Sequence, residues 1–343
     1  MSPSTGKSTG PLNIKSLWFN MHDIKKIALL RALQLGDFLC VVPAIRALRT
    51  FYPHAHISWI GLPGNEHLQK RFAHYLDEFI CFPGYPGLPE QAIHPKTILS
   101  FMQDMEEKSF DLVLQMQGNG TYVNELVTLF SARYCAGFYL ENNFRPNNDY
   151  FIPYPAHLHE IDRHLALMNH LNIATIETDL EFPFFPDSSL MGAKLNLAQQ
   201  SYVCIHPGSR GSWRQWAPEN FAKVADYCME LGYHVVLTGS KEEVEIANRV
   251  AKQMKFIPFI LTGQTNLDEM ATLLTNAKAL IANCTGVAHM AYALNTPSVI
   301  ISMDGEPFRW APKNDKQQMI DWLETPDYSL VLHMVEKVIL RNL

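Results

Sequence analysis

A short loop of small and basic residues in the second half of the chain could bind phosphate. The segment GSRGSWR (208–214) follows a predicted strand at 201–206 and precedes a predicted helix over 218–231. Backbone amides, hydroxyls and a guanidinium in such a loop bind phosphate oxygens, and the helix N-terminus adds positive potential. The alternative interpretation is a surface turn with an unrelated arginine.

A second junction of this kind lies further along the chain. Thr285 and Gly286 follow a predicted strand at 277–283 and open a predicted helix over 286–294. A threonine hydroxyl and free amides at a helix start can hold a phosphate oxygen, although plain N-capping by Thr285 would explain the same pattern. Two such junctions in one half favour a diphosphate site. Its predicted residues are Gly208, Ser209, Arg210, Arg214, Thr285, Gly286 and His289.

One acidic residue in the first half has a position suited to catalysis. Asp37 follows Gly36 where a predicted strand at 26–31 gives way to a helix over 38–50. An acid at that place stabilises the helix dipole. The same place points a carboxylate into a cleft, where it could accept a proton from an attacking hydroxyl. Position alone leaves both interpretations open, and Asp37 is the catalytic residue that we predict.

Several familiar catalytic motifs are missing from the sequence. The segment GKST (6–9) lacks the preceding glycine and strand of a P-loop, and no GxGxxG follows a strand. There is also no GxSxG elbow of a hydrolase. The 14 histidines include no HExxH, and the 6 cysteines no CxxC. We therefore predict no metal site and no cofactor, and we expect reduced, buried thiols.

Strand-like and amphipathic helical segments alternate in both halves of the chain. The predicted strands lie at 25–31, 56–61, 78–82, 111–117, 201–208, 233–240, 257–261, 277–284 and 297–302. Such alternation is typical of parallel sheets with crossover helices. We predict an α/β protein with two Rossmann-like, doubly wound parallel-sheet domains that face a cleft.

Length and local composition predict the domain boundaries. At 343 residues the chain exceeds the usual size of a single core. Irregular sequence between 140 and 190 indicates the junction. We predict a flexible leader (1–23), an N-terminal domain (24–185) and a C-terminal domain (186–325). An amphipathic helix within 326–343 could pack back on the N-terminal domain.

Charge and hydropathy narrow the possible partners and location. The net charge of −6 and the scattered basic residues give no reason to expect a nucleic-acid partner. The first 22 residues lack the apolar core of a signal peptide, and no apolar run approaches the ~18 residues of a spanning helix. We predict a cytoplasmic protein with at most peripheral contact to the inner face of the membrane.

Six motifs, taken together and in order, cover nearly the whole chain after residue 24. They are RALQLGD (31–37), DLVLQMQG (111–118), HEIDRHLAL (159–167), HPGSRGSWRQWAPENFA (206–222), VVLTGS (235–240) and NCTGVAHMAYAL (283–294). This set resembles the ADP-heptose:lipopolysaccharide heptosyltransferases, glycosyltransferase family 9, which have the GT-B fold. The resemblance implies a metal-independent, inverting transfer of heptose from ADP-heptose to a hydroxyl of a glycan or lipid-linked acceptor, as in lipopolysaccharide biosynthesis.

The resemblance also implies roles for particular residues. Asp37 would be the general base, and Arg214 stands where the family usually has a phosphate-binding lysine. With no divalent ion, Arg214, Ser209 and the Thr285–Gly286 junction would meet the charge of the departing diphosphate. The N-terminal domain would bind the acceptor and the C-terminal domain the nucleotide sugar. The implied nucleotide-binding residues are Glu242, Glu243, Leu261 and Thr262, and those on the acceptor side are Arg31, Gln117 and Asn119.

One departure from the family pattern keeps other functions open. The family's Asp-Thr-Gly reads Cys-Thr-Gly here, because Cys284 replaces the aspartate. A neutral thiol cannot accept charged hydrogen bonds as a carboxylate does. A different nucleotide-sugar donor, or a nucleotide-sugar-binding protein that has lost catalysis, are therefore alternatives. A sugar-nucleotide epimerase would need further acid and base residues, which we do not identify.

Overall fold

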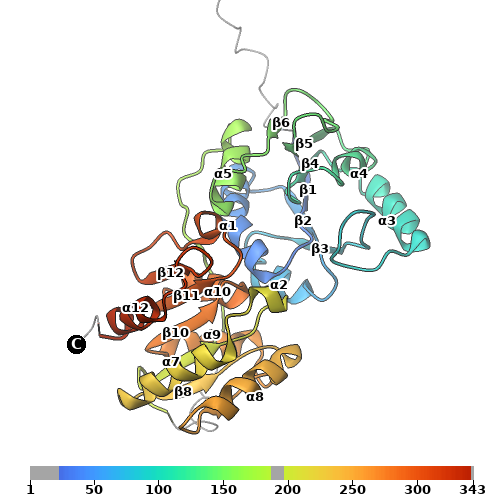
Figure 1. Ribbon diagram of the computed structural model, residues 1–343. Coiled ribbons are helices and arrows are strands. Elements are labelled where there is room, and N and C mark those ends of the chain that lie inside the picture. The colour runs from blue at the N-terminus through green and yellow to red at the C-terminus, as the bar shows by residue number, and fades with distance from the viewer. Residues whose placement is uncertain (1–22, 187–196, 341–343) are drawn as a thin grey trace, which may run out of the picture.

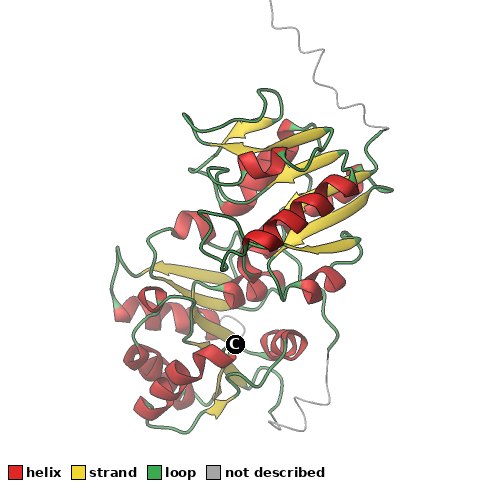
Figure 2. Cartoon of the chain, turned by 90° about the vertical axis from the view of Figure 1, so that its right-hand side faces the viewer, coloured by secondary structure: helices red, strands yellow, loops and turns green. Residues whose placement is uncertain are grey.

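Two parallel β-sheets form the framework of the molecule, one in each half of the chain (Figure 1). The computed structural model describes residues 23–186 and 197–340. Each sheet has six strands, and neighbouring strands pair in parallel. Helices lie on both faces of each sheet (Figure 2). The predicted α/β class with two doubly wound sheets is confirmed.

The N-terminal sheet has the strand order β3-β2-β1-β4-β5-β6. Its strands are β1 (Lys26–Leu30), β2 (His56–Gly61), β3 (Glu78–Cys81), β4 (Leu112–Gln115), β5 (Tyr134–Tyr139) and β6 (Phe151–Pro153). Its helices are α1 (Leu35–Phe51), α2 (Glu66–Arg71), α3 (Pro95–Lys108), α4 (Asn124–Thr128) and α5 (Glu160–His170). Because strand side chains alternate, Ile27 and Leu29 pack with α1 and α5, whereas Ala28 and Leu30 pack with α3 and α4.

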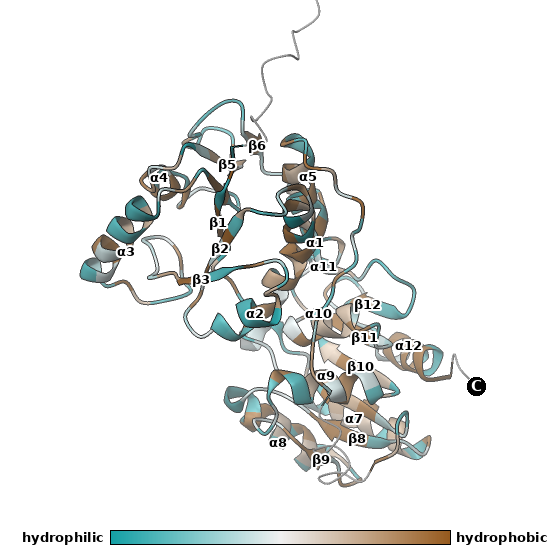
Figure 3. Ribbon diagram, turned by 180° about the vertical axis from the view of Figure 1, so that it is seen from behind, coloured by the Kyte–Doolittle hydropathy of each residue, from teal (hydrophilic) through white to brown (hydrophobic). Residues whose placement is uncertain are grey.

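The C-terminal sheet has the strand order β12-β11-β10-β7-β8-β9. Its strands are β7 (Tyr202–His206), β8 (His234–Leu237), β9 (Phe259–Ile260), β10 (Ala279–Asn283), β11 (Ser298–Ser302) and β12 (Gln317–Asp321). The α-helices are α7 (Pro218–Glu230), α8 (Val244–Gln253), α9 (Leu267–Asn276), α10 (Gly286–Ala293), α11 (Pro307–Trp310) and α12 (Tyr328–Leu340). Two short 3-10 helices are η2 (Ser212–Arg214) and η3 (Lys241–Glu243). In Figure 3 the strands are mostly hydrophobic, whereas hydrophilic residues gather on the outer helices.

The C-terminal helix α12 belongs to the second sheet. Val331, Val335 and Val338 share one face of α12 and lie in a core cluster with Ile281 of β10 and Val299 of β11. The expectation that this helix packs back on the N-terminal domain is therefore wrong, because its apolar face is buried against β10 and β11.

The other predictions concern the leader, the domain boundary, the strands and membrane-spanning helices. Residues 1–22 of the predicted leader lie outside the described residues, and the predicted boundary at 185/186 adjoins 187–196, which also lie outside them. Strands β5, β6 and β12 were missing from the prediction. None of the helices in the described part of the chain has the length and apolar character needed to cross a bilayer.

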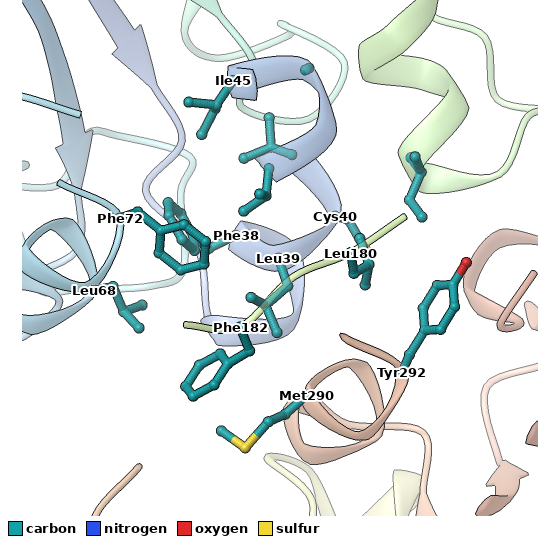
Figure 4. Packing of buried hydrophobic residues seen from close by; sticks show 14 of the residues in the cluster. Phe38, Leu39, Cys40, Ile45, Leu68, Phe72, Leu180, Phe182, Met290 and Tyr292 are labelled. Atoms are coloured by element: carbon teal, nitrogen blue, oxygen red, sulfur yellow. The ribbon is translucent and has the colours of Figure 1, made fainter. Parts of the chain in front are cut away.

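The two halves meet where α1 packs against α10. The hydrophobic cluster under both sheets is continuous through this contact. Figure 4 shows side chains that meet there, namely Leu39, Cys40, Leu180, Phe182, Met290 and Tyr292. The N-terminal end of α1 therefore lies beside the N-terminal end of α10. This contact brings the junction at Gly36 and Asp37 next to the junction at Thr285 and Gly286.

Candidate functional site

A cavity of about 840 Å³ lies between the halves, at the carboxyl ends of β7, β8 and β10. The N-terminal half contributes Gln34 and Leu35 to its wall. Ligands of open α/β sheets bind at this edge of the strands. The predicted residues that line it are Ser209, Arg210, Glu242, Glu243, Thr285 and Gly286. The structure therefore brings both predicted phosphate junctions and the two glutamates to one cavity.

The loop after β7 lies against the side chain of Glu243 in η3. A Cβ atom on Gly208 would lie 2.2 Å from Cδ of Glu243, so a larger residue there would require the glutamate side chain to move. The carboxylate of Glu243 accepts the Ser240 amide at 2.6 Å and lies 3.5 Å from Nε2 of His206. The Glu243 carboxylate therefore has partners in its own turn and in β7, whereas Glu242 is exposed, and both residues line the cavity.

Asn283, which the sequence analysis did not single out, joins the two phosphate junctions. Its Nδ2 donates to the carbonyl oxygens of Pro207 at 2.8 Å and Gly208 at 3.2 Å, and its Oδ1 accepts the Trp216 amide at 2.9 Å. An amide side chain can donate and accept in this way. Its place directly before Cys-Thr-Gly, at the end of a buried strand, was the available signal.

The hydroxyl of Thr285 is not used as a helix cap. Thr285 is the N-cap residue of α10, but its side chain makes no capping hydrogen bond. The first amides of a helix have no partner within the helix, and they favour anions. Thr285 and Gly286 both line the cavity, and their role at a phosphate stays a prediction.

The structure places Arg214 away from the cavity wall. Its guanidinium pairs with the buried carboxylate of Asp304, which also accepts hydrogen bonds from Ser302 Oγ at 2.8 Å and from the Glu306 amide at 3.2 Å. Asp304 was not predicted, because it is 90 residues from its partner. The charge of Arg214 is therefore partly balanced within the protein.

His289 lies in the contact between the halves. Its ring packs edge-on against Trp310, with 5.7 Å between ring centroids, and its Nδ1 lies 3.7 Å from Sγ of Cys40. Burial lowers the pKa of His289 to about 4, so the ring is neutral at pH 7. His289 does not line the cavity. Its predicted role at the phosphate is not supported by this placement.

Two predicted nucleotide-binding residues lie behind the cavity wall. Leu261 and Thr262 are buried, and the Thr262 hydroxyl donates to the carbonyl oxygen of Leu237 at 3.4 Å. The neighbouring Thr265 and Asn266 reach the cavity instead. Arg249, which was also missed, lies on the same wall.

Asp37 lies in the first turn of α1, and 27 % of its side chain is exposed. Its Oδ1 lies 3.4 Å from Nη2 of the buried Arg31. Burial raises the pKa of Asp37 above its ordinary value, although the charge of Arg31 opposes this rise. The carboxyl group is therefore a stronger base than a solvated aspartate.

The three residues predicted on the acceptor side differ in exposure. Arg31 is buried and donates to the carbonyl oxygen of Met116 at 2.8 Å. Gln117 is also buried, and its Oε1 accepts the Ala32 amide at 2.7 Å. Asn119 is half-buried and accepts the Thr121 amide at 3.0 Å. Arg31 and Gln117 are therefore buried at the carboxyl ends of β1 and β4, whereas Asn119 lies nearer the surface.

Within the described ranges, no three His, Cys, Asp or Glu side chains are grouped so that they could hold a metal ion.

A second cavity, of about 640 Å³, lies between β3 and α3. It is lined by none of the predicted site residues.

Known proteins match this arrangement along most of the chain. The chain is 22% identical over 310 residues to the lipopolysaccharide core heptosyltransferase OpsX of Haemophilus influenzae, covering 88% of this chain and 85% of that protein. It superposes on the crystal structure of a glycosyl transferase family 9 protein from Veillonella parvula with a TM-score of 0.76, at 20% identity over 93% of this chain and 98% of that one. The structure of E. coli ADP-heptose lps heptosyltransferase II gives a TM-score of 0.71, at 21% identity over 93% and 99%.

These likenesses show that the two sheets and the cavity between them form the GT-B fold of heptosyltransferase structures. Residues 98–331 match the sequence profile of glycosyltransferase family 9 (heptosyltransferase), which is more than half of the chain. The chain therefore belongs to glycosyltransferase family 9, the heptosyltransferases.

Proposed function

We propose that this protein transfers heptose from ADP-heptose to a hydroxyl of a lipopolysaccharide-type glycan or lipid-linked acceptor. The names of OpsX and of the E. coli structure support the substrate class. The observation that carries the proposal is the cavity, whose wall contains Arg210, Thr285 and Gly286 of the C-terminal half together with Leu35 at the start of α1, two residues before Asp37. In this proposal residues 24–185 bind the acceptor and 186–325 the donor, at the cytoplasmic side of the membrane.

In the proposed reaction Asp37 acts as the general base. Its carboxylate takes the proton of the acceptor hydroxyl while that oxygen attacks the anomeric carbon of heptose. The bond from this carbon to the phosphate oxygen breaks on the opposite face, and ADP leaves with the electron pair. Attack opposite the leaving group inverts the anomeric centre. A base of raised pKa suits this step, because proton transfer improves as the pKa approaches the working pH.

We further propose that groups of the protein, without a metal ion, stabilise the departing diphosphate. Arg210, the Thr285 hydroxyl and the first amides of α10 lie on the cavity wall. Fixed dipoles and cations aimed at developing charge lower the barrier without reorganising. Arg214, held by Asp304 near the same strand ends, would add positive potential.

Replacement of the base tests the catalytic role. Asp37→Asn should lower the rate of heptose transfer by ~10²-fold or more, because general-base catalysis is lost. Binding of ADP, measured by calorimetry, should persist. Glu66→Gln is the matched control, since Glu66 is also an acidic residue in the first turn of a helix of the same half. The substrates are ADP-heptose and lipopolysaccharide from a heptose-deficient strain. Full transfer by Asp37→Asn would reject the role.

The donor nucleotide is tested by calorimetry in buffer that contains EDTA. ADP should bind more tightly than UDP or GDP if ADP-heptose is the donor. Burial raises the pKa of Cys284 to about 12, so its thiol offers no charge to a donor sugar, and this favours testing other donors. Tighter UDP or GDP binding would support the different-donor alternative. ADP binding without any transfer would support a binding protein, and binding that requires magnesium would contradict the metal-independent proposal.

A further inference from the structure

Glu160, the first residue of α5, is a carboxylate with only 2 % of its side chain exposed. Its Oε1 accepts from Arg31 at 2.9 Å, and its Oε2 accepts from Arg163 and from Arg309, each at 2.9 Å. A buried carboxylate is costly unless cations and hydrogen bonds surround it. Burial alone would raise the pKa of Glu160. The contact with His164 and the charges of Arg31 and Arg309 outweigh burial and hold this pKa well below its usual range.

One guanidinium nitrogen is shared between Glu160 and Asp37. Nη2 of Arg31 lies 2.9 Å from Glu160 Oε1 and 3.4 Å from Asp37 Oδ1. The orientation of Arg31 is fixed, because its Nη1 donates to the carbonyl oxygen of Met116 at 2.8 Å and its Nε to that of Asp37 at 3.3 Å. The shorter bond goes to Glu160, so Asp37 receives only a weak share of the cation.

The same carboxylate connects the two halves of the molecule. Arg309 belongs to α11 of the C-terminal half, whereas Glu160 begins α5 of the N-terminal half. Two further contacts run alongside: Nε2 of His159 lies 2.8 Å from the carbonyl oxygen of Ala311, and Asp162 pairs with Lys313. Helix α5 is therefore attached to the segment 309–313 across the cleft.

We propose that Glu160 is a positioning residue, which draws the Arg31 guanidinium away from Asp37 and thereby keeps Asp37 basic while Arg309 ties the halves together. This inference rests on the proposed role of Asp37 as the base. Since Glu160 touches no reacting atom, it acts through Arg31. Without the charge of Glu160, the positive charge of the anchored guanidinium would favour the anion of Asp37 alone.

Other groups around the two carboxylates set the charge balance. The cations that face them are Arg31, Arg163, Arg214 and Arg309. The titratable groups there are His159, His164, Tyr154 and Cys40. Burial lowers the pKa of both histidines and raises the pKa of the phenol and the thiol, so these groups are uncharged near pH 7. Two further carboxylates pair with the outer arginines, Asp304 with Arg214 and Glu306 with Arg309. These arginines and the carboxylates that pair with them therefore set the charge balance.

The titration of Asp37 tests the proposal directly. In free enzyme labelled with ¹³C at the aspartate carboxyl groups, the Asp37 signal is assigned by its loss in Asp37→Asn. Glu160→Gln should lower the apparent pKa of Asp37 by roughly half a unit or more, because the like charge of Glu160 is removed and Arg31 no longer shares its cation with it. Arg309→Gln should raise that pKa, because it removes a cation that favours the anion. Glu160→Asp, which keeps the charge, should restore most of the parental value.

Opposite shifts separate positioning from general damage to the fold. Arg71→Gln is the control, since Arg71 of α2 also bridges the halves, through Asp268 of α9 at 2.6 Å, but lies apart from Asp37. It should leave the Asp37 titration unchanged. In transfer assays with ADP-heptose and heptose-deficient lipopolysaccharide, Glu160→Gln should lower kcat with little change in KM.

Each outcome decides between the two proposals. Unshifted titrations in Glu160→Gln and Arg309→Gln, or shifts of the same sign, would overturn the role of Glu160. If Glu160→Gln does not fold, the partly exposed Arg309 still provides the test, and the absence of an upward shift would reject the inference. Undiminished transfer by Asp37→Asn would reject the proposed base instead, whatever the titrations show.

Discussion

Gly36 shows how one missing side chain sets the distance between the two halves. A Cβ atom at this position would lie 2.6 Å from Cδ2 of His289 and 3.4 Å from Cα of Gly286. Real Cβ contacts are not this short, and His289 cannot retreat easily because its ring is buried against Trp310. Gly36 therefore allows the start of α1 to contact the start of α10, whose first backbone amides we propose to bind phosphate.

Gly36→Ala should accordingly lower stability in spite of the higher helix propensity of alanine. The expected loss is ~1–3 kcal/mol from overpacking, offset by up to ~1 kcal/mol from propensity. Urea unfolding of Gly36→Ala, His289→Ala and the double variant measures the coupling between the two sites. The double variant should be more stable than the sum of the single losses implies. Strict additivity would show that the close approach to His289 carries no strain.

At the scale of elements, the sequence predicts the strand ends and helix starts that build the cavity. Strands that are buried on both faces read as continuous apolar runs, so β1, β7 and β10 could be recognised together with the small residues that follow them. The edge strands β6 and β12 were missed, since edge strands carry a weaker pattern. The interior strand β5 was also missed, because its sequence YCAGFY contains a glycine and no continuous aliphatic run. Packing of α12 on the N-terminal domain was considered, but it covers the C-terminal sheet, because an amphipathic pattern does not say which sheet a helix will cover.

Pairings between distant elements were beyond sequence reasoning for a different reason. The ion pairs of Arg214 with Asp304 and of Glu160 with Arg309 join residues 90 and 149 positions apart. No periodicity links such partners. The contact of Arg214 with Asp304 depends on how the loops after two strands of the C-terminal sheet meet, and that of Glu160 with Arg309 on how the two halves pack. The motif HEIDRHLAL contained Glu160, but a lone acid at a helix start reads first as a helix-dipole residue. Six residues of the cavity wall were predicted, whereas these ion pairs, none of whose members lines the cavity, were not.

At the scale of the whole molecule, two buried histidines make the stability of the fold depend on pH. His289 of α10 contacts Cys40 of α1 where the halves meet, whereas His164 lies within the N-terminal half, one helical turn from Glu160 on α5. Burial lowers the pKa of each ring to about 4, from an ordinary value near 6.5. Between these values the unfolded chain binds protons that the folded protein excludes, so stability falls as the pH decreases. The lowered pKa of Glu160 also makes stability fall as the pH decreases below the ordinary pKa of a glutamate. The raised pKa of Asp37 has the opposite effect on stability.

The free energy of unfolding should therefore be greatest above about pH 6.5 and decline toward pH 4. Each of the two histidines should account for a loss of roughly 3 kcal/mol at the acid end, since one pKa unit corresponds to ~1.4 kcal/mol. Urea unfolding, followed by tryptophan fluorescence at pH 7.5 and at pH 5, measures this decline. His289→Gln should flatten the pH dependence, because glutamine has no proton to bind, whereas His54→Gln, at an exposed position, should leave it unchanged. Equal stability at both pH values would mean that the interface between the halves accommodates a charged His289 ring. The buried contact of His289 with α1 would then not hold the two halves together in solution.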